Sequence, residues 1–156
     1  MSNVQQVIIR PMTQDDVPIV FTIELVAQIH DPWTVGIFRD CIAVGYECCV
    51  IEVADRIVGY YIMSTAAEET HILNIVVKPN MQGRGYGKQL LQALMASARA
   101  QHSQRIFLEV RVSNKIAQAM YFQEGFKRIG MRRDYYPCGA GREDAITMEL
   151  VLSDEQ

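Results

Sequence analysis

The pattern of apolar and polar residues along the chain predicts strands alternating with helices. Short runs rich in β-branched and aromatic residues, which are typical of strands, occur at Val7–Pro11, Glu47–Val53, Ile57–Ser64, Ile72–Val77, Ile106–Val112, Phe126–Arg132 and Ala145–Leu152. Between them, apolar residues recur at helical spacing in stretches that begin near Thr13, Thr34, Lys88 and Lys115. The predicted order is β-α-α-β-β-β-α-β-α-β-β, which indicates an α/β (α+β) fold with a mixed sheet.

Residues with known preferences for helix ends set the boundaries of these helices. Thr34 is expected to cap the second helix and Gly45 to close it, while Ser113 or Asn114 caps the last helix and Gly125 stops it. A loop over 135–141 is expected between the last two strands. With neither an internal repeat nor a linker, the sequence predicts a single domain over residues 1–156.

A strand–helix–strand unit lies in the middle of the chain. It consists of the strand at 72–77, the helix from Lys88 to about Gln101 and the strand at 106–112. Because connections of this kind join parallel strands of one sheet, these two strands are expected to be parallel neighbours.

Charge and hydropathy exclude several classes of function. The formal net charge is −3 in 156 residues, which favours neither a nucleic-acid partner nor a membrane surface. A small basic cluster at Lys127, Arg128, Arg132 and Arg133 is interpreted as a solvated face. No apolar run is long enough to span a membrane, and residues 1–6 lack the pattern of a signal peptide. A soluble, cytoplasmic protein is therefore expected.

The cysteines and histidines do not predict a metal site. Cys41, Cys48, Cys49 and Cys138 show neither a CxxC pattern nor the density of a disulfide scaffold, and three histidines are scattered. Cys48 and Cys49 fall in a predicted strand, where burial as small hydrophobic residues is expected.

The segment Gln82–Lys88 contains three glycines between a predicted strand and a predicted helix. The first amide groups of a helix lack intrahelical partners, so this position binds anions such as a diphosphate. Arg84 and Lys88 add positive charge. The spacing does not match a P-loop and is one residue short of the dinucleotide fingerprint. The alternative is a glycine-rich turn before a core helix.

Two residues of the C-terminal half could supply acid–base chemistry. Glu109 interrupts an apolar strand and, by period-2 alternation, faces away from Leu108 and Val110. It is either a general base or a solvent-facing residue. Tyr121 is either a proton donor or a core aromatic residue, and Asn114 is most simply a helix cap.

Several segments together resemble one known family. Gln82-x-x-Gly85-x-Gly87 resembles the acetyl-coenzyme A pyrophosphate signature of the GNAT superfamily of N-acetyltransferases. More specific likeness to its RimI group, the ribosomal-protein-alanine N-acetyltransferases, is carried by Pro32-Trp33, Leu108–Asn114, Ala117, Ala119–Tyr121, Gly125-Phe126, Arg133–Pro137 and Glu143–Ala145. The likeness runs from the first strand to about Leu150, which is nearly the whole chain. Departures are Tyr86 and Lys88 in the glycine loop and the segment 138–141.

The resemblance implies the GNAT fold, a mostly antiparallel sheet with helices on both faces and a parallel strand pair splayed around acetyl-CoA. It also implies roles for particular residues. Glu109 would be the general base and Tyr121 the general acid. The coenzyme would be bound by Ile75, Val76, Val77, Gln82, Gly83, Arg84, Gly85, Tyr86, Gly87, Lys88 and Asn114. The acceptor would be bound by Trp33, Asp134, Tyr135, Tyr136, Glu143 and Asp144.

The activity implied by the resemblance is transfer of acetyl from acetyl-CoA to the N-terminal alanine of a small-subunit ribosomal protein, number eighteen. Neither a metal, nor a nucleic acid, nor a membrane is expected to take part. Two alternatives remain open. One keeps the chemistry but changes the acceptor to another protein N-terminus, a lysine or a small amine. The other is a non-catalytic module that binds acyl-CoA.

Overall fold

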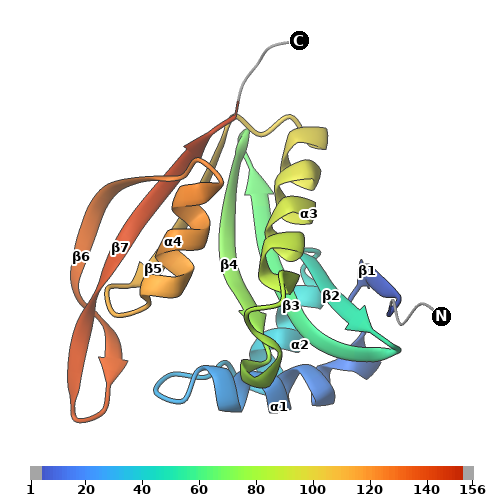
Figure 1. The fold of residues 1–156 in the computed structure, drawn as a ribbon. Coiled ribbons are helices and arrows are strands. Elements are labelled where there is room, and N and C mark those ends of the chain that lie inside the picture. The colour runs from blue at the N-terminus through green and yellow to red at the C-terminus, as the bar shows by residue number, and fades with distance from the viewer. Residues whose placement is uncertain (1–4, 153–156) are drawn as a thin grey trace. The chain divides into compact units, whose positions relative to one another are not determined.

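The structure, a computed structural model, describes residues 5–152. Its strands form one seven-stranded sheet in the order β1-β2-β3-β4-β5-β7-β6 (Figure 1). The strands are β1 (Val7–Pro11), β2 (Glu47–Val53), β3 (Arg56–Ala66), β4 (Glu69–Val77), β5 (Arg105–Arg111), β6 (Lys127–Cys138) and β7 (Gly141–Val151). The helices are α1 (Val17–Ala27), α2 (Val35–Ala43), α3 (Tyr86–Ala100) and α4 (Lys115–Gln123). Within residues 5–152, none of the helices has the length and hydropathy that crossing a bilayer requires.

The predicted order of elements is confirmed, and so is the mixed, mostly antiparallel sheet. β4 pairs with β5 in parallel, with Glu69–His71 opposite Arg105–Phe107. The pairs β1–β2, β2–β3, β5–β7 and β6–β7 are antiparallel. The strands on either side of the glycine loop are therefore parallel neighbours, as the strand–helix–strand pattern predicted.

The predicted caps are also present. The Thr34 hydroxyl accepts a hydrogen bond from the Ile37 amide (3.1 Å) at the start of α2. The Asn114 side chain accepts one from the Ala117 amide (3.1 Å) at the start of α4. Asn114, and not Ser113, is therefore the cap of the last helix.

The prediction of a loop over 135–141 is wrong. β6 continues to Cys138 and β7 begins at Gly141, so that only two residues make the turn. Pro137 lies within β6, which is at the edge of the sheet, where a proline is tolerated in a strand. The register shifts between Arg132 and Tyr136, which marks a bulge in the edge strand.

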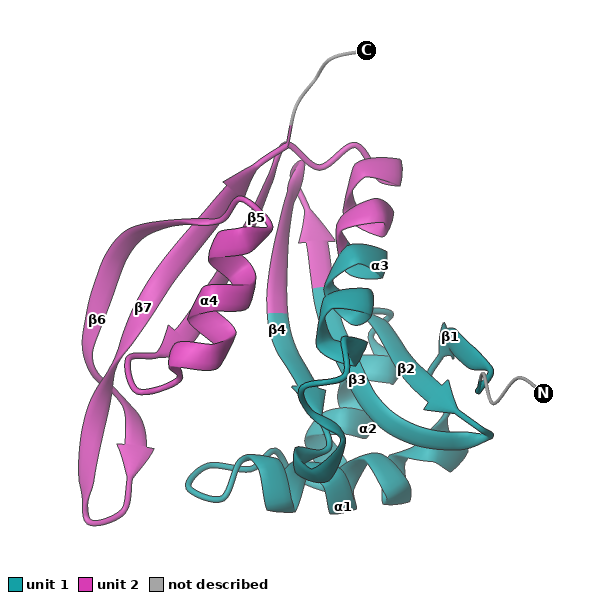
Figure 2. Cartoon of the chain, viewed as in Figure 1, with its two compact units in different colours: residues 1–63, 73–94 teal, residues 64–72, 95–156 magenta. Residues whose placement is uncertain are grey.

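The chain divides into two compact units (Figure 2). Unit 1 comprises residues 1–63 and 73–94, and unit 2 comprises residues 64–72 and 95–156. The single domain over residues 1–156 stays a prediction. Residues 1–4 and 153–156 lie outside the described residues, and with them most of the segment on which the expectation about a signal peptide rests.

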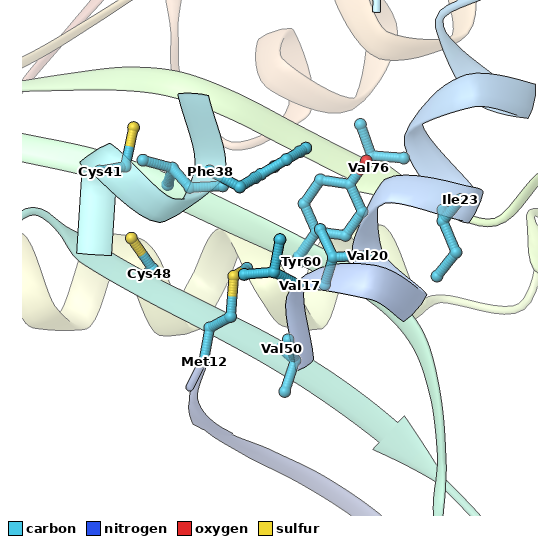
Figure 3. Close-up of a cluster of buried hydrophobic side chains, with 11 residues drawn as sticks. Met12, Val17, Val20, Ile23, Phe38, Cys41, Cys48, Val50, Tyr60 and Val76 are labelled. Carbon is cyan, nitrogen blue, oxygen red and sulfur yellow. The ribbon is translucent and has the colours of Figure 1, made fainter. Parts of the chain in front are cut away.

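Helices cover both faces of the sheet in unit 1. The ring of Tyr60 in β3 meets Phe38 of α2 edge to face, with centroids 5.7 Å apart. The neighbouring residue Gly59 faces α3, since a Cβ there would lie 3.2 Å from Leu90 Cδ1. Adjacent residues of a strand point to opposite faces, so the two helices lie on opposite sides. Figure 3 shows the core on the α1 and α2 side. It contains Met12, Val17, Val20, Ile23, Phe38, Cys41, Cys48, Val50, Tyr60, Ile62 and Val76.

Of the two cysteines predicted to be buried as small hydrophobic residues, Cys48 is buried and Cys49 is half-buried. Cys41 and Cys48 are buried, Cys49 and Cys138 are half-buried, and all are free thiols. Burial raises the pKa of the Cys48 thiol to about 12. Among residues 5–152, no three His, Cys, Asp or Glu side chains group in a way that could hold a metal ion.

A fully buried glutamate joins four elements of unit 1. Glu24 of α1 has 0% exposure. Its carboxyl group accepts hydrogen bonds from the Tyr60 hydroxyl (2.6 Å), the Asn74 side-chain amide (3.1 Å) and the Trp33 backbone amide (2.9 Å). Gln28 in turn donates to the Asn74 side-chain oxygen (3.1 Å). Burying a polar group is costly unless it is hydrogen-bonded, and here three donors satisfy this carboxyl group.

We expect Glu24→Gln to lower the free energy of unfolding by about 1–3 kcal/mol. A glutamine has the same shape but replaces one acceptor oxygen with an NH₂ donor, which would face a donor in this network. Urea denaturation measures the change. Glu69→Gln, at a carboxyl group that is 48% exposed, is the matched control and should change stability by less than about 0.5 kcal/mol. Equal effects of the two substitutions would contradict the structural role of Glu24.

Candidate active site

The glycine loop of unit 1 has the backbone geometry of an anion site. Gly83 and Gly85 have φ values of +79° and +88°, which L side chains rarely adopt. The Gln89 amide donates to the Gly85 carbonyl (3.1 Å), so α3 begins immediately after this glycine. The amides of the first helical turn then point along the helix axis toward the loop. The side chains of Arg84 and Lys88 are exposed beside it. The local structure therefore suits a bound diphosphate.

Two contacts hold the end of β4 next to this loop. The Gln82 side chain donates to the Val77 carbonyl (3.1 Å). On the neighbouring strand, a Cβ at Gly59 would lie 2.6 Å from the Val76 carbonyl oxygen, so this close approach requires glycine. Sequence reasoning missed Gly59. The signal was available, because a lone glycine inside a strand pattern indicates that another part of the backbone lies close by.

Glu109 occupies the predicted position in the middle of β5, in unit 2. Leu108 and Val110 on either side are buried, whereas the Glu109 side chain keeps 27% exposure. The predicted alternation of faces is therefore confirmed. The Glu109 carboxylate forms an ion pair with Arg132 of β6, at 2.9 Å between Oε2 and Nε. The sequence pattern gave no indication of this partner.

Tyr121 of α4 is buried with 5% exposure, and its ring packs on Phe126 with centroids 5.6 Å apart. Burial raises the pKa of this phenol above its ordinary value, and the neighbouring Tyr136 raises it further. The hydroxyl therefore keeps its proton throughout the neutral range, as a proton donor must. The core-aromatic interpretation and the acid interpretation are compatible at this residue.

Tyr136 connects the two candidate catalytic residues electrostatically. Burial raises the pKa of Tyr136 to about 12, and the charge of Glu109 contributes in the same direction. The Tyr136 phenol also raises the pKa of Tyr121. Its ring meets Tyr135 edge to face (4.9 Å between centroids). The structure thus brings Glu109, Tyr121 and both tyrosines of the predicted acceptor site together within unit 2.

The acidic residues of the predicted acceptor site already have partners in the protein. Glu143 forms an ion pair with Arg111 (3.0 Å) and accepts hydrogen bonds from the Ser113 hydroxyl and amide (both 3.1 Å). Asp144 accepts a hydrogen bond from the Asp134 amide (2.8 Å). These contacts fasten the β6–β7 hairpin. A direct role of Glu143 and Asp144 with an acceptor stays a prediction.

Trp33 lies in unit 1, whereas the other predicted acceptor residues lie much later in the chain and in unit 2. Its ring packs on Phe38 (5.3 Å between centroids), and its amide donates to Glu24. The predicted coenzyme residues also lie in unit 1, except for Asn114. The candidate catalytic and acceptor residues lie in unit 2, except for Trp33. The roles assigned to them by resemblance stay predictions.

Comparison with known proteins establishes the family. The model of the acetyltransferase (GNAT) family matches residues 12–126. This range includes the glycine loop, Glu109 and Tyr121. The chain therefore belongs to the acetyltransferase (GNAT) family.

Relatives from two bacteria are similar over almost their full length. The ribosomal protein bS18-alanine N-acetyltransferase of Haemophilus ducreyi is 35% identical over 145 residues, which cover 92% of this chain and 99% of that protein. The enzyme of the same name from Salmonella typhimurium is 34% identical, over 91% and 95% of the two chains. The crystal structure of the ribosomal-protein-S18-alanine N-acetyltransferase from Escherichia coli superposes with a TM-score of 0.90 at 31% identity, covering 97% of each chain. The resemblance to the RimI group is thereby confirmed.

We expect the stabilising effect of Glu143 to depend on pH. Burial of this carboxyl group raises its pKa, but hydrogen bonds from Ser113 and Arg111 outweigh burial and hold the pKa below its ordinary value of 4.5. A lowered pKa gives stability that is fully present above 4.5 and is lost as the pH falls through the lower, folded-state value. Glu143→Gln should therefore cost about 1–3 kcal/mol at pH 7 through lost charge-assisted hydrogen bonds.

Urea denaturation of the wild type and of Glu143→Gln over a range of pH measures this effect. The difference in unfolding free energy should be largest at neutral pH and shrink in acid. A difference that stays constant down to the acid range would show that the charge of Glu143 does not contribute to stability.

Proposed function

We propose that this protein transfers the acetyl group of acetyl-CoA to the N-terminal alanine of ribosomal protein bS18. The observation that carries the proposal is the similarity to relatives of that activity, which are between 33% and 35% identical. The matches extend over 83% to 92% of this chain and at least 89% of those proteins. The family match over residues 12–126 includes the glycine loop, Glu109 and Tyr121.

The glycine loop supports acetyl-CoA as the acetyl donor. Coenzyme A carries a pyrophosphate, and the start of α3 after Gly85 offers unpaired amide groups and the positive end of the helix dipole. Arg84 and Lys88 complement the charge. In this proposal the backbone of Ile75–Val77 binds the pantetheine arm, as in the family that the chain resembles. Asn114 contributes to coenzyme binding beside its role as a helix cap.

The chemistry requires a neutral amine, a base and an acid. An α-amine has a pKa of about 7.7–8.0, so most of it is protonated at neutral pH and must lose a proton. Glu109 takes this proton. The amine nitrogen attacks the thioester carbonyl carbon, a C–N bond forms, and the C–S bond breaks. The coenzyme A thiolate that leaves takes the proton of the Tyr121 hydroxyl, which burial keeps protonated until this step. The nitrogen loses its second proton to solvent as it becomes an amide, and solvent restores the proton of Tyr121.

The proposal predicts acetylation of an alanine α-amine. Incubation with acetyl-CoA of a short peptide copied from the N-terminus of bS18 should add one acetyl group, located by mass spectrometry on the α-amine. A peptide with a blocked N-terminus and one lysine is the control and should stay unmodified. Acetylated lysine in the control, or no product on either peptide while coenzyme A still binds, would point to another acceptor or to a non-catalytic module.

Substitution of the candidate acid and base should separate chemistry from binding. We expect Glu109→Gln and Tyr121→Phe each to lower kcat by about 10²–10⁴-fold, the usual contribution of a general acid or base. Binding of acetyl-CoA, measured by calorimetry, should be unchanged because both residues lie outside the glycine loop. Tyr46→Phe, at an exposed ring, is the control and should keep full activity. Near wild-type turnover in Glu109→Gln would refute its role as the base.

A further inference from the structure

Unit 2 contains two similar sets of an arginine, a glutamate and a tyrosine. In the first set, Arg111 pairs with Glu143 (3.0 Å) and lies over the Tyr136 ring (4.5 Å to the centroid). In the second set, Arg132 pairs with Glu109 (2.9 Å) and lies over the ring of Tyr135 (5.2 Å to the centroid). Each guanidinium group is thus held between a carboxylate and an aromatic face.

The two sets differ in how firmly the arginine is held. Arg111 and Glu143 are 17% and 13% exposed, and Arg111 also donates to the Pro137 carbonyl (2.8 Å). Arg132 is 59% exposed and Glu109 is 27% exposed. Water and salt screen an exposed ion pair, so separating it costs little. The first set is therefore a fixed part of the hairpin, while the second set can open.

The second set contains Glu109, the residue proposed as the base. A carboxylate beside aromatic rings suits any small cation, through charge and through attraction to the ring faces. A protonated α-amine is such a cation. Ala145 of β7 lies opposite Arg111 of β5 on one side and opposite Arg132 of β6 on the other. The two arginines therefore share a face of the sheet. Glu109 lies two residues from Arg111 on β5, so it is on that face too.

We propose that Arg132 holds the place of the acceptor's ammonium group on Glu109 and is displaced when the acceptor binds. This inference rests on the proposed function, because it takes the acceptor to be a protonated α-amine. In the absence of acceptor, Arg132 keeps the Glu109 carboxylate paired. The arriving ammonium group replaces the guanidinium group at the carboxylate and then gives its proton to Glu109. Arg132 therefore competes with cationic acceptors for the Glu109 carboxylate and does not compete with neutral ones.

Two peptides that differ in one group test this competition. Both copy the N-terminus of bS18, but one begins with alanine and the other with lactic acid, whose hydroxyl replaces the ammonium group. Calorimetry at pH 6.5 in the presence of coenzyme A measures their affinities, since the α-amine is protonated well below its pKa. Arg132→Gln should bind the alanine peptide up to about fivefold more tightly than the wild type. The lactyl peptide should bind equally to both proteins.

Two further variants make the comparison specific. Arg105→Gln is the matched control, because Arg105 forms another exposed pair on β5 with Glu149 (2.6 Å; 46% and 18% exposed). It should change the affinity of neither peptide. Arg132→Lys retains a cation and should bind the alanine peptide as the wild type does.

The possible outcomes separate this inference from the proposed function. Two results would overturn the inference alone: the affinities of the alanine and lactyl peptides change equally in Arg132→Gln, or the alanine peptide binds this variant more weakly. In either case Arg132 would orient Glu109 instead of competing with the acceptor. Failure of the wild type both to bind and to acetylate the alanine peptide would overturn the proposed function together with the inference.

Discussion

The buried carboxyl group of Glu24 is the interaction on which the arrangement of unit 1 depends. It joins α1 to β3 through Tyr60, to β4 through Asn74 and to the segment before α2 through Trp33. Hydrogen bonds in a buried network are directional, so they fix positions that apolar packing alone leaves adjustable. Asn74 lies three residues before the end of β4 at Val77. The position of that strand end next to the glycine loop follows from this network and from the close approach of Gly59.

Unit 2 is organised by charge pairs, and burial decides what each carboxylate can do. Glu143 is surrounded by Arg111 and Ser113 and fastens a hairpin. Glu109 has one exposed arginine at 2.9 Å and keeps more than a quarter of its side-chain surface open. A base must be able to release its partner and accept a proton, and a carboxylate fixed by several donors cannot do so at low cost. The same residue type therefore serves structure at one position and suits chemistry at the other.

Much of the fold could be predicted from the sequence because its signals are local. Apolar periodicity located the strands and helices, and Thr34 and Asn114 marked helix starts as predicted. The glycine loop could be interpreted from adjacent residues alone. The extension of β6 through Pro137 could not, because whether a proline is tolerated depends on the strand lying at the edge of the sheet. Glu24 likewise appeared as one polar residue in a helix, since its partners lie 36 and 50 residues away in the chain.

The candidate site shows the same limit. Sequence and resemblance pointed to Glu109 and Tyr121 as candidates, but not to the side chains that surround them. Tyr136 raises the pKa of Tyr121, the charge of Glu109 raises the pKa of Tyr136, and Arg132 pairs with the Glu109 carboxylate. Tyr136 and Arg132 both come from an edge strand whose register includes a bulge. A bulge shifts which side chains face a neighbour, and no local pattern predicts the result. The surroundings of the proposed base Glu109 are thus set by contacts that the fold creates, above all by the pair with Arg132, whose side chain is 59% exposed.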